Sequence, residues 1–281
     1  MTTQPPGFGA GFDRLVSRPG DGDAVFGTNV LDALVGPLRE AASVRRTERS
    51  WGPGVLGCAM WMDDPELIEV LGQMANACVV ITKQQARKYQ QSEFGLLEAL
   101  AERTGIAQRA YPELEELAPR VDGQASVVGP FSTLPDDEGE IGGVRELGFR
   151  RVGNRLVPIV HAKMLLLGRM GWTDEHPSGH VVDTLYFVPE RLWVGSANFT
   201  QASRKSLEMG MWTADPELLK AARGWLLQLV EMSEPLRSPS DDSQPELVPV
   251  EYDDAAIAEY MSERDFDFLF GDGLNDDADP C

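Results

Sequence analysis

Short apolar runs alternate with segments of helical periodicity in the first part of the chain. Residues 55–62 and 77–82 are continuous apolar runs, which are typical of strands buried on both faces of a sheet. Residues 27–44, 64–77 and 93–103 carry apolar side chains at the three- and four-residue spacing of amphipathic helices. This order predicts an α/β domain with a mixed, largely covered β-sheet flanked by helices.

The pattern weakens in the middle of the chain and then returns. Residues 111–155 are rich in Pro, Gly and acidic residues, and they predict only one strand, at 125–128. Apolar runs at 157–167, 192–194 and 208–212 predict further strands of the sheet. The central stretch therefore supplies several of the strands.

Two of the predicted helices begin with the same chemistry. Asp64 and Asp215 are each followed by Pro, Glu and Leu. An Asp at the N-cap, Pro at the first helical position and Glu in the first turn all favour the start of a helix. The second of these helices is expected to end near residue 232.

The two ends of the chain differ in composition from the region between them. Residues 1–24 are rich in Gly and Pro and have no apolar signal-peptide core, which predicts a flexible lead-in. Residues 233–281 are rich in Ser, Pro and Asp, and they predict a disordered acidic linker and tail with one brief helix at 255–261. One folded domain is expected over residues 25–232.

The net charge of −20 is unevenly distributed. Residues 231–281 hold 16 acidic and 2 basic residues, so most of the negative charge belongs to the tail. Arginines cluster at 45–49 and 145–155, so a locally basic groove for nucleic acid is compatible with the composition. The acidic tail is expected to bind either a protein partner or the molecule's own groove.

Neither a membrane span nor a cysteine-based site is predicted. No run of about 18 apolar residues occurs, which makes a cytoplasmic location the expectation. The three cysteines form no CxxC pair, and Cys58 and Cys78 lie in apolar runs where they are expected to be small core residues.

Polar residues interrupt the apolar runs in a pattern suited to a phosphate. His161 and Lys163 are two apart, so on a strand their side chains lie on the same face. Gly195 allows close approach of the backbone, and Ser196 and Asn198 offer a hydroxyl and an amide to phosphate oxygens.

Three charged residues further along complete the predicted site. Glu208 is expected to accept a hydrogen bond from Nδ1 of His161, which would leave Nε2 free to attack or to donate a proton. Arg204 and Lys205, together with Gly195, are expected to contact the substrate. Each residue alone has a plain structural explanation, whereas the ordered set predicts a catalytic site.

This set resembles the signature of the phospholipase D superfamily, which is His-x-Lys, usually with an Asp further along, then Gly-Ser-x-Asn and a downstream Glu. The chain has His161-Ala162-Lys163, the segment Gly195-Ser196-Ala197-Asn198-Phe199-Thr200, and Glu208. The resemblance implies a phospholipase D-like fold and a phosphodiesterase that uses a phosphohistidine and no cofactor or metal. Lys163, Ser196 and Asn198 would then neutralise the phosphate oxygens.

Two features depart from the family pattern. Gly168 stands where the family usually has Asp. A long segment also separates Lys163 from Gly195, which predicts an insert at about 169–183 that forms a loop or a long hairpin beside the site.

The number of histidines has a consequence for assembly. The family mechanism needs one His to attack phosphorus and another to protonate the leaving oxygen, but only His161 of the three lies in a motif. A symmetric homodimer that pairs two His161 side chains would supply both. The alternative is that His176 or His180 is the second acid or a zinc ligand, although their Pro- and Gly-containing segment favours a surface loop.

The substrate stays open among three hypotheses. A nuclease that cleaves DNA or RNA is favoured by the clustered arginines and by the resemblance of residues 195–200 to nuclease members of the superfamily. A phospholipase or transphosphatidylase would need an apolar surface, for which residues 164–170 and Trp172 are the candidates. A catalytically degenerate nucleic-acid-binding module is the third hypothesis, to which Gly168 lends support.

Overall fold

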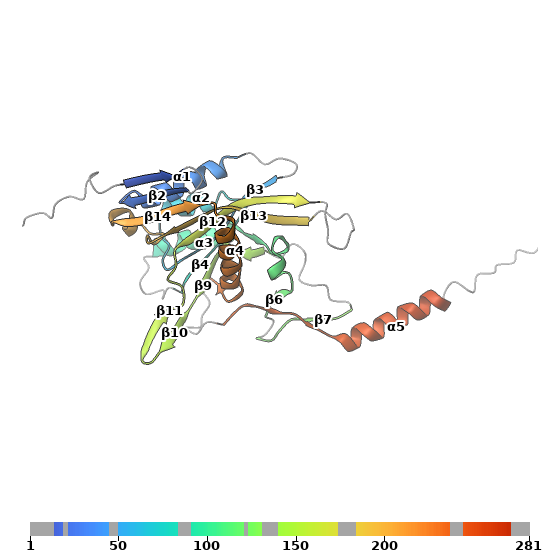
Figure 1. Cartoon of the computed structure of the whole chain (residues 1–281). Helices are drawn as coiled ribbons and strands as arrows, with labels where there is room; N and C mark the ends of the chain where they lie inside the picture. The colour runs from blue at the N-terminus through green and yellow to red at the C-terminus, as the bar shows by residue number, and fades with distance from the viewer. Residues whose placement is uncertain are drawn as a thin grey trace, which may run out of the picture.

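The computed structural model describes residues 14–18, 22–44, 50–83, 91–120, 123–130, 140–173, 184–236 and 244–270. Its centre is a nine-stranded mixed sheet (Figure 1). In spatial order its strands are β1 (Arg14–Arg18), β2 (Gly22–Gly27), β14 (Glu208–Thr213), β13 (Thr184–Gly195), β12 (Met164–Thr173), β3 (Ser50–Ala59), β4 (Asn76–Thr82), β9 (Val144–Leu147) and β15 (Glu234–Pro235). Only β3, β4 and β9 run parallel to one another, and the other pairs are antiparallel.

Helices cover both faces of this sheet. One face packs against α1 (Val30–Ala42), α2 (Pro65–Leu71) and α3 (Gln91–Arg103). The other face packs against α4 (Pro216–Glu231) and two 3-10 turns, η1 (Gln108–Ala110) and η2 (Pro112–Leu114). The apolar residues of β3 and β4 divide between the two cores, which confirms the predicted mixed, covered sheet.

Smaller elements surround the sheet. Four two-stranded ribbons pair β10 (Phe149–Val152) with β11 (Arg155–Pro158), β5 (Gly105–Ala107) with β8 (Glu140–Gly142), β6 (Leu117–Pro119) with β16 (Leu247–Pro249), and β7 (Val127–Val128) with β17 (Glu251–Tyr252). A 3-10 turn, η3 (Gln201–Lys205), precedes β14, and helix α5 (Asp254–Phe270) ends the described chain.

The two predicted helix starts are confirmed. The Asp64 carboxylate accepts a hydrogen bond from the backbone N–H of Leu67 at 3.0 Å, and Asp215 accepts one from Leu218 at 2.9 Å. Helix α2 ends at Leu71, earlier than predicted, because the chain turns at Gly72 and enters β4 at Asn76.

The predicted flexible lead-in at 1–24 is wrong for its last part. Strand β1 pairs with β2, and β2 pairs with β14, so this hairpin forms one edge of the sheet. The strand of residues 14–18 has two arginines and a serine among five residues, and its polar character hid it in the sequence.

The boundary predicted at residue 233 is also wrong. Ser233 and Glu234 are buried, and the Glu234 carboxylate pairs with the buried Lys83 ammonium at 3.1 Å. Leu247 is buried in the core under α4. The folded domain therefore continues beyond residue 232, and α5 is longer than the brief helix predicted at 255–261. Residues 271–281 lie outside the described part.

The expected insert at 169–183 belongs to a long hairpin. Its first residues, Arg169 to Thr173, are the outer half of β12 and pair with β13 down to Thr184. His176 and His180 lie in the connecting segment, which is outside the described residues. In the described part of the chain, no helix is both long and apolar enough to span a membrane.

Candidate active site

The two motif segments meet at one end of the sheet. Residues 161–163 lead directly into β12, and Gly195 ends its neighbour β13. Glu208 begins β14, the next strand along. The backbone N–H of Gly195 donates to the carbonyl oxygen of Lys163 at 3.2 Å, so the sheet hydrogen bonding joins the two segments.

Lys163 is held beneath His161. Its side chain is buried, with 8% of the residue exposed, and its Nζ donates to the carbonyl oxygen of His161 at 2.8 Å. Burial lowers the pKa of Lys163 below its ordinary value, while the Glu208 carboxylate and the Cys58 thiol act in the opposite direction. A partly desolvated ammonium interacts more strongly with an anion than one in bulk water does.

His161 is exposed and points its Nδ1 towards this lysine. The distance between Lys163 Nζ and His161 Nδ1 is 3.4 Å. The preceding residue fixes the backbone here, because the carbonyl oxygen of buried Val160 accepts a hydrogen bond from the Thr82 hydroxyl at 2.8 Å.

Glu208 contacts a different residue from the predicted one. Its carboxylate accepts a hydrogen bond from the Ser196 hydroxyl at 2.5 Å, and no hydrogen bond joins it to His161 among the described residues. The Ser196 oxygen accepts in turn from the N–H of Met209 at 3.0 Å. The Ser196 hydroxyl therefore donates its proton to Glu208 in this structure. The prediction was that it would donate this proton to a phosphate oxygen.

Asn198 and Gly195 have different roles in the same segment. The Asn198 Oδ1 atom is buried and has no hydrogen-bond partner among the described residues, so its amide is incompletely satisfied. A Cβ added at Gly195 would lie 2.8 Å from the carbonyl oxygen of Met209. Close packing of β13 against β14 thus explains Gly195, whereas the prediction gave it a substrate contact.

Arg204 is occupied by carboxylates, contrary to its predicted contact with substrate. Its guanidinium pairs with Asp64 at 2.5 Å, with Asp32, and with Glu66 at 3.6 Å. The Asp64 hydrogen bond and these charges raise the pKa of Arg204 further above its ordinary value. Lys205, its neighbour, is exposed.

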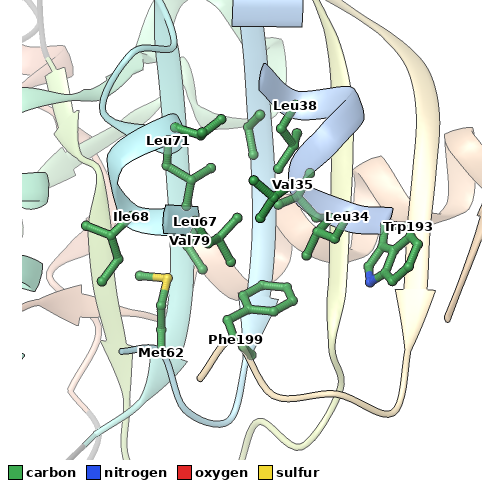
Figure 2. Close-up of a cluster of buried hydrophobic side chains, with 14 of the residues drawn as sticks. Leu34, Val35, Leu38, Met62, Leu67, Ile68, Leu71, Val79, Trp193 and Phe199 are labelled. Carbon is green, nitrogen blue, oxygen red and sulfur yellow. The ribbon is translucent and has the colours of Figure 1, made fainter. Parts of the chain in front are cut away.

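Phe199 anchors the motif segment to the domain, a role that was not foreseen. Its ring is fully buried between α1, α2 and the sheet, beside Met62 and Leu34 (Figure 2). Its N–H donates to the carbonyl oxygen of Trp61 at 3.0 Å, and its own carbonyl oxygen accepts from Asp63 at 2.9 Å. A Phe directly after Asn198 was the available signal, because an aromatic residue in a polar loop needs a buried site.

Gly168 has a packing explanation. It lies at a register shift between β12 and β13, and an added Cβ would overlap the carbonyl oxygen of Val188 and the ring of Phe187. The Asp of the family pattern has no room here. Its absence therefore gives no support to the hypothesis of a degenerate site.

Comparisons with known proteins give structural matches only. No family model matches the sequence, and a search of curated proteins found no match. NucT from Helicobacter pylori is 12% identical with a TM-score of 0.42, and the match covers 72% of this chain and 88% of that one. Nuc from Salmonella typhimurium, a phospholipase D family member, is 12% identical with a TM-score of 0.37, covering 72% and 90%.

A third match is to part of a larger protein. Polyphosphate kinase from Porphyromonas gingivalis is 15% identical with a TM-score of 0.41, and the match covers 80% of this chain but 27% of that one. All three TM-scores lie below 0.5. No group of three His, Cys, Asp or Glu side chains suited to a metal occurs within the described ranges.

Proposed function

We propose that this chain is a phosphodiesterase of the phospholipase D superfamily. The observation that carries the proposal is the convergence of exposed His161, buried Lys163 and the Ser196–Glu208 pair at one end of the sheet. These are the residues of the family signature, and they come from two separate segments of the chain. A packing role explains Arg204 and Gly195. It does not explain an exposed His beside a buried ammonium that makes no ion pair with any residue the structure describes.

The proposed reaction proceeds in two displacements at phosphorus. In the first, an imidazole nitrogen forms a P–N bond while the P–O bond to the leaving group breaks, and a second imidazole gives its proton to the leaving oxygen. In the second, water attacks phosphorus, its proton returns to the second imidazole, and the P–N bond breaks. Lys163 neutralises the charge that develops on the phosphoryl oxygens.

The second imidazole comes, in this proposal, from another copy of the chain. His161 is exposed, so two copies related by a two-fold axis can place two imidazole rings about one phosphate. Light scattering during turnover tests this point. A monomer with full activity would contradict the dimer and leave the phosphodiesterase proposal standing.

We propose nucleic acid as the substrate. Three exposed arginines, Arg150, Arg151 and Arg155, precede His161 closely in the chain, and they favour a polyanion. The apolar surface that a phospholipase would need was expected at residues 164–170, but Leu165, Leu166 and Met170 are buried in β12. This burial counts against the phospholipid alternative.

The decisive experiment compares the wild type with His161→Ala on single- and double-stranded DNA and RNA and on phospholipid vesicles, with and without a chelator. Cleavage of nucleic acid that resists the chelator and falls about 10⁴-fold or more in the variant is expected, because the nucleophile is removed. Headgroup release from vesicles would favour the phospholipid alternative. Salt-sensitive binding without any product would favour the binding module.

The acidic tail is proposed to compete with the substrate for this site. The structure changes the best truncation point, since a cut after residue 232 would remove Glu234 from buried Lys83. A cut after Asp253 removes α5 and leaves the buried pair. We expect activity at low salt to rise about two- to threefold, with the difference lost at high salt because charges are screened. An equal rate at low salt would contradict the proposal.

A further inference from the structure

The β10–β11 hairpin is joined to His161 of the candidate site by two residues, Ile159 and Val160. Strand β9 ends at the same end of the sheet as the candidate site. After Gly148 the chain forms β10, turns, and returns along β11. Pro158 ends β11, and His161 follows, so their backbones are at most about 11 Å apart. Figure 1 shows that the hairpin projects from the body as a separate ribbon.

The base of this hairpin is fixed to the sheet. The N–H of Ile159 donates to the carbonyl oxygen of Gly148 at 3.2 Å, which closes the ribbon. Val160 is buried, and its carbonyl oxygen accepts the hydrogen bond from Thr82. The anchor residues lie directly before His161, so the hairpin has a defined position relative to the imidazole.

The hairpin is basic in an acidic protein. Arg150, Arg151 and Arg155 are exposed, and residues 148–159 contain no acidic side chain. None of these three arginines makes an ion pair with a residue in the described part of the chain, whereas Arg145, Arg204 and Arg223 each do. Three unpaired guanidinium groups beside a phosphate-suited site are placed to bind further phosphates of the same polymer.

The arginines lie on both faces of the ribbon. Arg150 is directly opposite Val157, and Arg155 is opposite Val152, so these two arginines share one face. Arg151 is opposite Leu156 on the other face. A ribbon with cations on both faces suits a groove that has a phosphate backbone on each side.

The dimensions of the hairpin favour a DNA groove. Each strand has four residues, so the ribbon is about 13 Å long, with its strands about 4.8 Å apart. The major groove of B-form DNA is about 12 Å wide and admits a two-stranded ribbon. The major groove of duplex RNA is deep and narrow and excludes side chains.

The tip of the hairpin argues against a membrane anchor. Gly153, with φ of 60°, and Asn154 form the turn, and the left-handed backbone there suits glycine. A segment that inserts into lipid needs an apolar leading edge, but this tip is polar. The exposed aliphatic side chains Val152 and Leu156 point to opposite faces, each directly across from an arginine, so they form no continuous apolar face.

We propose that the β10–β11 hairpin seats in the major groove of duplex DNA and holds the phosphodiester at His161. This inference rests on the proposed function and sharpens it, because it names double-stranded DNA as the preferred substrate. The hairpin arginines are positioning residues that contact phosphates flanking the one that reacts.

The test uses the full chain and the triple variant Arg150→Gln/Arg151→Gln/Arg155→Gln on two substrates. Duplex DNA spans the site and the hairpin, whereas bis(p-nitrophenyl) phosphate is too small to reach both. We expect kcat/KM on duplex DNA to fall about 10- to 100-fold, and the slope of log kcat/KM against log salt to become shallower by about 3. Hydrolysis of the small diester should be unchanged.

The matched control is the triple variant Arg39→Gln/Arg103→Gln/Arg169→Gln. It removes the same charge from exposed positions on α1, α3 and the outer half of β12. We expect the control to retain most of the activity on duplex DNA. An equal loss in both triple variants would mean that net charge, and not the hairpin, decides binding, and would overturn the proposal.

The remaining outcomes separate this inference from the proposed function. If the wild type cleaves none of DNA, RNA, phospholipid and the small diester, the phosphodiesterase proposal fails. If it cleaves both and the hairpin variant cleaves duplex DNA as well as the wild type, only the hairpin proposal fails. Faster cleavage of duplex RNA than of duplex DNA of the same sequence, or hairpin-dependent binding to anionic vesicles instead of DNA, would also overturn it.

Discussion

Two charged clusters contact the segment that runs from Gly195 to Glu208, and they differ in how completely their charges are paired. In the first cluster, Arg204 contacts three carboxylates and Asp64 is fully buried. In the second cluster, Lys163 is nearly as buried but makes no ion pair within 4 Å with any described residue, and His161 is exposed.

This difference teaches how to separate structural from functional charges. A buried ion pair whose hydrogen bonds are all made has no capacity left for a ligand, although breaking it is costly. A partly buried cation with an unused donor gains most when an anion arrives. Both clusters contain residues predicted as site residues. The ion pairs of Arg204 explain it as a structural residue, whereas Lys163, which has no such pair among the described residues, is proposed to act in the reaction.

The largest expected effect is on stability, from Arg204→Met. The substitution leaves the buried Asp64 carboxylate without its cation, so the free energy of unfolding should fall by about 3–5 kcal/mol. Urea denaturation followed by circular dichroism measures this change. A variant that is as stable as the wild type but inactive would contradict this assignment, because it would indicate that Arg204 contacts the substrate.

Lys163→Met is expected to lower activity without lowering stability, which is the opposite of the effect expected for Arg204→Met. Loss of the ammonium should lower kcat about 10²- to 10³-fold, since one preorganised group that stabilises the transition state is removed. The free energy of unfolding should stay the same or rise, because the variant no longer buries a charge. A loss of stability comparable to that of Arg204→Met would show that Lys163 is a structural charge after all.

Glu208→Gln should change the pH dependence. In the proposed mechanism protonated Lys163 binds phosphate, so activity is expected below the pKa of Lys163 and should be lost as the pH rises through it. Burial lowers this pKa from 10.5, and the negative charge of Glu208 counteracts the shift. Without that charge the alkaline limb of kcat/KM should move to lower pH, whereas Glu102→Gln on α3 should leave it in place. An unmoved limb would exclude Lys163 as the titrating group.

The smallest effect is expected for Arg39→Gln at the outer rim of the Arg204 cluster. Arg39 and Glu66 lie 3.5 Å apart with side chains 59% and 53% exposed. Solvent screens such a pair, so the free energy of unfolding should change by less than about 1 kcal/mol in thermal or urea denaturation. A loss as large as that of Arg204→Met would mean that the cluster acts as one cooperative unit.

The sequence was a good guide where local rules decide the structure. The Asp-Pro-Glu starts of α2 and α4 and the apolar runs of β3 and β4 follow from capping and periodicity. The β10–β11 hairpin was missed, although Gly153-Asn154 between short alternating strands is a recognisable turn signal. Strand β1 carried no such signal, because its five residues show no apolar alternation and the strand is defined by its pairing with β2.

By itself, the sequence determined the α/β class, the helix starts and the set of polar residues that includes His161, Lys163, Asn198 and Glu208. Only the tertiary structure decided the partners of the polar side chains: Glu208 binds Ser196 and not His161, Arg204 pairs with Asp64, and Glu234 pairs with Lys83. The physical reason is that capping and periodicity act over a few residues, whereas these contacts depend on strand order and burial. The two ion pairs join residues more than 100 positions apart in the sequence.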